Sequence, residues 1–267
     1  AVYTYNISKY KSQEDESSKK EQNILNESHY EHEYKSSIRD YGYRMSFDYR
    51  PSPHHHIRFG NDFTWHFFHP QTRNLISSDT SMGNDTTFMS SKINYPAREC
   101  SLYAEDEMII NDHWSINAGV NASLFSIHGK TFSNFNPRFA IKYQPLTNLS
   151  FKASYTSMTQ YVHKISNSFL ELPTDYWVPT TEILHPMNSW QLTAGAYFQP
   201  ETHWLISLEG YYKHSNHLLQ YASWSGLEPP AAKWEKMVMD GEGRFYGMEV
   251  DAAYKSGNFQ LRGSYTL

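Results

Sequence analysis

The chain has 267 residues and a formal net charge of −5 at pH 7, and 39% of its residues are hydrophobic. No stretch approaches ~20 consecutive apolar residues, which excludes a transmembrane helix. The mild negative charge argues against a nucleic-acid-binding surface, and the single cysteine, Cys100, excludes an internal disulfide.

Eleven segments of alternating polar and apolar residues are predicted to be strands. The second is the clearest, because Tyr41 and Tyr43 share one face and Arg44 lies on the other. In the fourth neither face can be assigned, because Leu102 and Asp106 fall on the same side. In chain order the segments are residues 2–10, 40–49, 57–67, 97–110, 114–127, 135–143, 149–156, 190–198, 204–212, 246–254 and a last one from 259.

The connections between these segments alternate between short and long. Tight turns are predicted at residues 50–55, 111–113, 145–148, 199–202 and 256–258. Longer polar connections are predicted at residues 11–37, 71–92, 129–134, 161–186 and 218–243, and the first of these is expected to be mobile. Tight turns at one end of an antiparallel sheet and large loops at the other are typical of a transmembrane β-barrel.

We therefore predict an all-β fold, an antiparallel transmembrane β-barrel that residues 1–267 form as one domain. Aromatic residues make up 16% of the chain, a share that suits strands and membrane–water boundaries. Eleven strands is an odd number, whereas bacterial single-chain barrels have even counts, so the pattern indicates a fragment of a larger barrel. A soluble β-sandwich also alternates, but it does not require short and long connections to take turns.

Several motifs occur in an order that resembles a known family. They are NPRFA at residues 136–140, LSFKASY at 149–155, QYVH at 160–163, SNS at 166–168, LPTDYWVP at 172–179, SLYAEDE at 101–107, YGMEV at 246–250 and GSYTL at 263–267. This succession resembles the C-terminal barrel of TonB-dependent outer-membrane receptors, particularly the subgroup related to SusC-type nutrient importers.

The resemblance implies a receptor in the outer membrane of a Gram-negative bacterium that binds a scarce nutrient, such as an oligosaccharide or an iron chelate, and imports it. The family builds a 22-stranded barrel around an N-terminal plug, so about eleven strands are half of such a wall. Neither a plug domain nor a TonB box is recognisable in the sequence. The implied partners are outer-membrane lipid, the nutrient, a surface lipoprotein and, through the missing N-terminal part, the TonB–ExbB–ExbD complex.

Two other classes of protein are compatible with the pattern of strands. One is a passive porin-like or adhesin-like barrel without energy coupling, and the other is a soluble β-rich binding module. An upstream plug with a TonB box would favour the importer, and folding that depends on detergent would favour either barrel over the soluble module.

The two longest connections of the second half carry the candidate ligand-binding residues. Aromatic rings can stack on sugars or planar chelates, and a neighbouring carboxylate can hold a polar group. The alternative is that these rings pack the loops against each other, because long loops need a core of their own. The candidates, all predicted to be extracellular, are Tyr161, His163, Asp175, Tyr176, Trp177, Tyr221, Trp224 and Trp234.

Eight charged residues are predicted to face the lumen of the barrel, where mixed charges solvate the wall or hold a plug. They are Arg44, Arg58, Arg138, Lys142, Glu209, Glu249, Asp251 and Arg262.

No metal site, cofactor or catalytic residue is predicted. His54, His55 and His56 lie in a predicted tight turn, and three consecutive residues of an extended segment cannot all face one ion. The sequence contains no Gly-x-Ser-x-Gly, no phosphate-binding glycine loop and no His-Glu-x-x-His. We therefore expect that the chain is not an enzyme.

Overall fold

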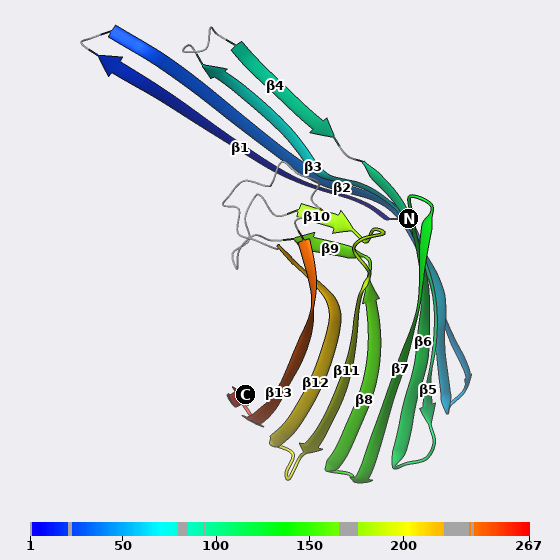
Figure 1. Ribbon diagram of the computed structural model, residues 1–267. Helices are drawn as coiled ribbons and strands as arrows, with labels where there is room; N and C mark the ends of the chain where they lie inside the picture. Colours follow the sequence, from blue (N-terminus) through cyan, green and yellow to red (C-terminus); the bar gives the residue numbers. More distant parts are fainter. Residues whose placement is uncertain are drawn as a thin grey trace.

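The computed structural model describes residues 2–20, 23–79, 85–92, 94–165, 176–221, 235 and 238–267. Within these residues the chain forms one antiparallel 12-stranded sheet, in the order β1-β2-β3-β5-β6-β7-β8-β11-β12-β13-β14 with β4 paired to β3, and a separate β9–β10 pair. The sheet curves strongly, and the β9–β10 hairpin lies inside the curve (Figure 1). In the described part of the chain, no helix has the length and hydropathy needed to cross a bilayer.

The strands differ widely in length. Their bounds are β1 Val2–Lys20, β2 Asn23–Ser52, β3 His55–Asp79, β4 Asp85–Lys92, β5 Tyr95–Ile109, β6 Trp114–Ile127, β7 Lys130–Leu146, β8 Leu149–Gln160, β9 Val162–Ile165, β10 Tyr176–Pro179, β11 Met187–Phe198, β12 Trp204–Tyr221, β13 Val238–Ser256 and β14 Phe259–Thr266.

Consecutive strands of the sheet lie side by side, so their connections alternate between its two ends. The five predicted tight turns are confirmed and all lie at one end, which we call the turn end; the opposite end is the loop end. Each closes an antiparallel hairpin, as where Ser256 pairs with Phe259 between β13 and β14. Gly257 in that turn has a φ of 56°, a left-handed conformation that glycine adopts without steric cost.

The predicted long connections are wrong in extent at the loop end. His128 and Gly129, with φ of 47° and 83°, form a tight turn, so β7 begins at Lys130 and the predicted loop at 129–134 is strand. Most of residues 11–37 and 71–92 is also strand, paired as β1–β2 and β3–β4. The strand pairing satisfies the backbone hydrogen-bonding groups of these segments. Because most of their side chains are polar, the sequence shows no alternation of apolar and polar residues that would predict strands here. Fourteen strands are described instead of eleven.

Cross-strand register places the apolar residues of successive strands on one face, which we call the outer face. Tyr41 pairs with Trp65, and Phe47 pairs with Phe59, whose ring centroid is 5.2 Å away. The opposite face, toward the β9–β10 hairpin, is the inner face. Exposed residues of the outer face include Tyr41, Tyr43, Met45, Phe47, Tyr49, Phe59, Trp65, Leu102, Trp114, Leu124, Phe135, Phe139, Phe151, Leu192, Phe198, Ile206, Leu208, Tyr212, Tyr246, Met248, Leu261 and Tyr265.

The register also settles the faces of β5, which the sequence leaves open. Leu102 pairs with Ala122 on the outer face, whereas Tyr103 and Glu105 lie on the inner face. Asp106 is on the outer face as well, but at the turn end, where its carboxylate lies 2.7 Å from the ring of His55. Asp106, which interrupts the polar–apolar alternation of β5, therefore lies at the edge of the apolar surface.

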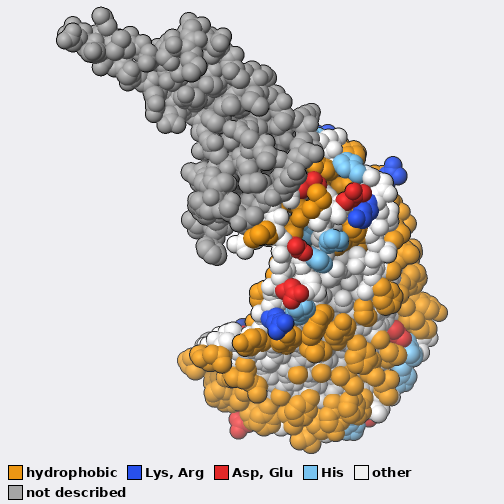
Figure 2. Space-filling model, viewed as in Figure 1, with side chains coloured by type: hydrophobic (Ala, Val, Ile, Leu, Met, Phe, Trp, Pro, Cys, Tyr) orange, Lys and Arg blue, Asp and Glu red, His pale blue; other side chains and the backbone are white. Residues whose placement is uncertain are grey.

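An exposed apolar surface of this extent marks contact with hydrocarbon or with a partner. Figure 2 shows hydrophobic side chains along the outer rim of the described sheet and charged and histidine side chains gathered in its hollow. The arrangement is that expected of a membrane-spanning strand wall, with apolar residues toward lipid and polar residues inside.

Buried apolar residues are concentrated at the loop end, on the inner face. Phe68 of β3 and Phe125 of β6 have no exposed surface, and they belong to one cluster with Ile165 and Val178 of the β9–β10 hairpin. The hydrophobic core thus sits where the hairpin packs against the wall and not between two layers of sheet, because the outer face remains uncovered by the described residues.

A lysine on the outer face is expected to destabilise the sheet far more than a lysine on the inner face. Leu208 is an outer-face residue with 46% of its surface exposed, and its neighbour Ser207 lies on the inner face, where it pairs with Asp251. Leu208→Lys places a charge in hydrocarbon at a cost of about 2–4 kcal/mol near the bilayer mid-plane, whereas Ser207→Lys places its charge opposite the carboxylate of Asp251. Urea unfolding in lipid vesicles measures both variants, and equal losses would contradict the assignment of faces.

Candidate functional site

The inner face carries the charged residues that the sequence predicts to face a lumen. By register all eight, from Arg44 on β2 to Arg262 on β14, lie on this face; that the face lines a lumen stays a prediction. Four of them take part in three ion pairs: Arg44 with Asp62, Arg58 with Glu105 at 2.7 Å, and Arg262 with Asp251 at 2.7 Å. Since such exposed pairs contribute at most about 1 kcal/mol each, they orient charge more than they stabilise the sheet.

A buried histidine with two carboxylates lies near the loop end of the inner face. His66 is 7% exposed, its Nδ1 is 2.8 Å from Asp40 and its Nε2 is 3.3 Å from Glu99. Both ring nitrogens face an acceptor, so this environment suits the imidazolium, in which both donate. The ring also stacks on Phe68 at 5.5 Å. Sequence reasoning did not single out this group, because its members come from three strands whose register no local pattern gives.

The β9–β10 hairpin covers this part of the inner face. Val162 pairs with Pro179 and Ile165 with Tyr176, and the hairpin contacts β2 and β3 on one side and β12 on the other. Figure 1 shows it inside the curve of the sheet, at the loop end. The hairpin therefore bridges β2 and β3 to β12 across the inner face at the loop end.

Tyr161 anchors the hairpin to β6. Its ring lies parallel to that of Phe125, with centroids 4.9 Å apart, and the residue is only 2% exposed. Its hydroxyl is 2.7 Å from the hydroxyl of Ser123 and accepts a hydrogen bond from Asn134 at 3.0 Å. This burial matches the packing alternative for Tyr161, and ligand contact by this residue stays a prediction.

His163 is held inside the same hairpin. It is 4% exposed, and among the described residues its ring nitrogen Nε2 is hydrogen-bonded to the hydroxyl of Thr180 at 3.1 Å. Burial lowers the pKa of His163 to about 4, so the ring is neutral at neutral pH. Like Tyr161, it is buried in this arrangement, and ligand binding by His163 stays a prediction.

The remaining loop candidates are less constrained. Trp177 is 37% exposed on β10 and is therefore available for stacking. Tyr176 begins β10 and Tyr221 ends β12, whereas the predictions for Asp175, Trp224 and Trp234 lie outside the described residues. Ligand binding by these residues stays a prediction, with Trp177 as its best-placed member.

The three consecutive histidines at the turn end each have a separate partner. The ring of His54 is 3.1 Å from the carbonyl oxygen of Ile109, His55 is 2.7 Å from Asp106, and His56 is 2.7 Å from Asp48. Within the described residues, no three His, Cys, Asp or Glu side chains are arranged to hold a metal ion. The contacts of His54 and His55 tie the β2–β3 turn to β5.

Taken together, the described side chains form a polar concave wall with a folded hairpin over its loop end and one half-exposed tryptophan on that hairpin. Such a surface can bind and admit a polar solute. Several of its charged groups, such as Arg44 and Arg58, pair with carboxylates of neighbouring strands.

Comparisons with known proteins agree with this architecture. A family model described as "TonB dependent receptor-like, beta-barrel" matches residues 2–267, and no curated protein matches the chain. The FrpB iron transporter from Neisseria meningitidis (F3-3 variant) is 12% identical, with a TM-score of 0.58, over 97% of this chain and 43% of that protein.

Two further solved structures are similar. The copper transporter OprC is 11% identical, with a TM-score of 0.56, over 90% of this chain and 43% of its own. The RagAB peptide transporter is 9% identical, with a TM-score of 0.57, over 99% of this chain and 34% of its own. At these identities the likeness concerns the fold alone, and the chain spans less than half the length of each.

Removing the hydroxyl of Tyr161 is expected to loosen the hairpin. Tyr161→Phe keeps the ring on Phe125 but leaves Ser123 and Asn134 without this partner, at a cost of about 1–3 kcal/mol. Hydrogen exchange of residues 161–165 should accelerate accordingly. The matched variant Tyr155→Phe, on the outer face, should leave exchange in the hairpin unchanged, and an equal response of the two variants would contradict the anchoring role.

Acidification is expected to open the same hairpin. The folded pKa of His163, about 4, is below its ordinary value of 6.5, so the stabilisation is complete above 6.5 and is lost as the pH falls toward 4. Between pH 7 and pH 5 the linkage predicts roughly 20-fold faster exchange of residues 161–165, after correction for the intrinsic rate. His163→Gln, which cannot titrate, should abolish this pH dependence; if the dependence persists, His163 is not its source.

Proposed function

The chain belongs to the TonB-dependent receptor-like β-barrel family, and on this premise we propose that it forms wall strands of a transporter that takes up a scarce nutrient. It lies in the outer membrane of a Gram-negative bacterium. The observation that carries the proposal is the separation of faces: an exposed apolar outer surface and a charged inner surface, with a folded hairpin over the loop end. The same separation argues against a soluble binding module, whose apolar faces would be covered.

In this proposal the loop end is extracellular and the turn end periplasmic, because barrels of this kind have short periplasmic turns and longer extracellular loops. The β9–β10 hairpin then stands in the path from the medium to the inner face. Trp177, half-exposed on that hairpin, is the residue we propose for the first contact with the nutrient, through stacking on a flat ring or chelate.

The substrate is proposed only as a class. An oligosaccharide or an iron chelate offers flat apolar surface for an aromatic residue and polar groups for the inner face. The titles of the similar structures name iron, copper and a peptide for those proteins, so fold alone does not select among these cargoes. Family membership supports a transporter and not an enzyme.

Energy coupling through the TonB–ExbB–ExbD complex, and a surface lipoprotein as a further partner, are part of the proposal by resemblance to the family. A passive porin-like barrel, the alternative, would need no energy source for uptake. Uptake that stops when the proton-motive force is dissipated supports coupling, and uptake that continues at an unchanged rate supports the passive barrel.

The decisive experiment is uptake by a strain that lacks this protein, profiled against a panel of carbon and metal sources. We expect loss of growth on one nutrient class and its restoration by the wild-type gene. Trp177→Ala should reduce uptake roughly 10-fold at limiting nutrient, as expected for loss of one stacking contact of about 1.4 kcal/mol.

Trp177→Phe is the matched control, because it retains an aromatic face and should keep most of the uptake. Surface labelling of folded receptor must show equal amounts of the three proteins. Full uptake by Trp177→Ala at equal abundance would remove Trp177 from the binding site, and growth of the deletion strain on every nutrient would argue against the proposed importer.

A further inference from the structure

A hollow on the inner face, which we call the basic hollow, combines two cations with neutral hydrogen-bonding groups. Its volume is about 390 Å³. Arg138 of β7 and Lys213 of β12 line it, whereas no carboxylate of the described part of the chain does. The other residues of its lining are Asn121, Asn136, Ser157, Met158, Thr159, Gln160, Met187 and Ser189. The basic hollow therefore carries positive charge that its own walls do not balance.

Cross-strand register places the two cations in one row of the inner face. Arg138 pairs with Thr156 of β8, and Lys213 pairs with Gln191 of β11. Thr156 and Gln191 are direct partners in turn. Three strand spacings separate the two cationic residues by roughly 14 Å of backbone, a gap that two long side chains can narrow to the size of a small group. Because the two residues between them are uncharged, a negative group of a ligand can take that position.

The carboxylate of the same row is already paired elsewhere. Beyond Arg138 the row crosses β6 and reaches Glu105 of β5, which forms an ion pair with Arg58 at 2.7 Å. Within the described residues, no ion pair involves Arg138 or Lys213, and the ammonium of Lys213 lies 5.9 Å from the ring centroid of Phe245. The charge of both cations is therefore available to an anion in the basic hollow.

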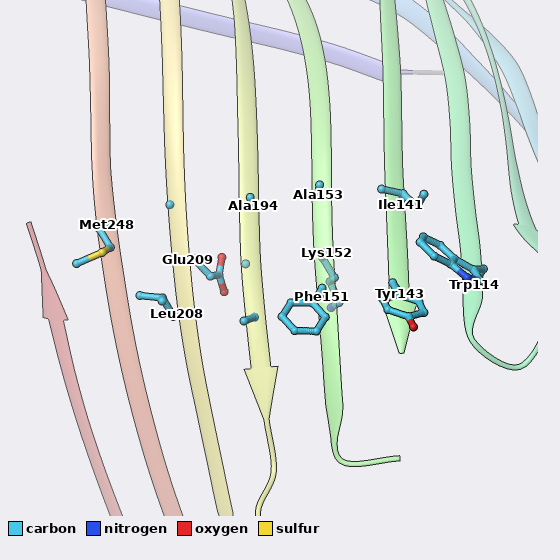
Figure 3. A pocket seen from close by; sticks show the side chains of 13 residues that line it. Trp114, Ile141, Tyr143, Phe151, Lys152, Ala153, Ala194, Leu208, Glu209 and Met248 are labelled. Atoms are coloured by element: carbon cyan, nitrogen blue, oxygen red, sulfur yellow. The ribbon is translucent and has the colours of Figure 1, made fainter. Parts of the chain in front are cut away.

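A second hollow on the inner face shows that this excess of cations is not general. Lys142 and Lys152 line that hollow, but Glu107 and Glu209 line it too. Figure 3 shows Lys152 on β8 and Glu209 on β12, on either side of β11. The second hollow thus holds as many carboxylates as lysines. What sets the basic hollow apart is the composition of its lining, with two cations and no carboxylate among the described residues.

The neutral part of the lining supplies hydrogen-bond donors and a link to the β9–β10 hairpin. Asn136 is 6% exposed, and its Oδ1 accepts a hydrogen bond from the hydroxyl of Thr159 at 2.9 Å. The amide NH2 of Asn136 is then the end that donates. The side-chain amide of Gln160 donates to the carbonyl oxygen of Val162 in β9. The basic hollow therefore reaches the base of the hairpin, where a solute that passes the hairpin arrives.

We propose that the basic hollow binds a carboxylate or phosphate group of the imported solute between Arg138 and Lys213. A guanidinium holds such a group through two parallel hydrogen bonds, and an ammonium adds a compact charge. Met158 and Met187 offer adaptable apolar surface to the rest of the solute. The inference rests on the proposed function and deepens it, because it names an acidic solute as the class of nutrient.

The test measures anion binding by the receptor as the cell produces it, folded in detergent. The midpoint of thermal unfolding is followed while citrate, or separately inorganic phosphate, is added at constant ionic strength. A bound anion raises the midpoint of the wild type. Arg138→Gln and Lys213→Gln should each require roughly 10-fold more of the anion for the same rise, because each removes one charge-assisted contact.

Three results would overturn the proposal. The first is a wild-type midpoint that rises with neither anion. The second is a rise that either variant retains in full. The third is a loss of stability in both variants without added anion, combined with no response of the wild type to citrate or phosphate, because the two cations would then bind a carboxylate of the protein itself.

Two further variants serve as controls. Lys142→Gln removes an inner-face lysine from the hollow that carboxylates also line, and it should respond to the anions like the wild type; an equal loss here would mean that the anions sense only the charge of the whole face. Arg138→Lys/Lys213→Arg keeps both charges and should retain most of the response. Because binding is measured and not uptake, failure of the anion site leaves the proposed importer untouched, and the reverse also holds.

Discussion

The whole structure depends on cross-strand register. Side chains of a strand alternate between faces with a period of two, so a slip of one residue between neighbouring strands would exchange their apolar and polar sides. From β2 to β14 the register keeps residues such as Phe47, Leu192 and Met248 together on the outer face. The backbone ladder supplies the hydrogen bonds, which a membrane-spanning wall must satisfy internally, and no second sheet is needed to bury the apolar rows.

Packing of side chains against each other is concentrated at the loop end. There the β9–β10 hairpin brings its own apolar residues onto β3 and β6, with Tyr161 stacked on Phe125 and Val178 fully buried. This contact shapes the approach to the inner face, because the hairpin reaches from β12 to β2 and β3. The aromatic residues of this hairpin therefore differ in environment. Tyr161 packs against the sheet, whereas Trp177 is partly exposed.

Charged side chains on the inner face have three kinds of environment. Arg58 and Arg262 are neutralised by carboxylates of adjacent strands. His66 is enclosed by two carboxylates and by aromatic rings. Lys142 and Lys152 are direct partners that form no ion pair, and Glu107 and Glu209 line the hollow beside them.

The sequence by itself determined the class of fold, the five turns at one end and the two faces of most strands. These properties are local, because turn residues and the two-residue alternation of side chains can be recognised within about ten neighbouring residues. The part of β1 after residue 10 and the strand β4 were not predicted, because these segments are mostly polar and show no regular alternation of apolar residues. Only the tertiary structure decided that Tyr161 and His163 are buried, that Asp40 and Glu99 meet at His66, and that two lysines are direct partners. Each of these joins residues from different strands, and the register that brings them together is a property of the whole sheet.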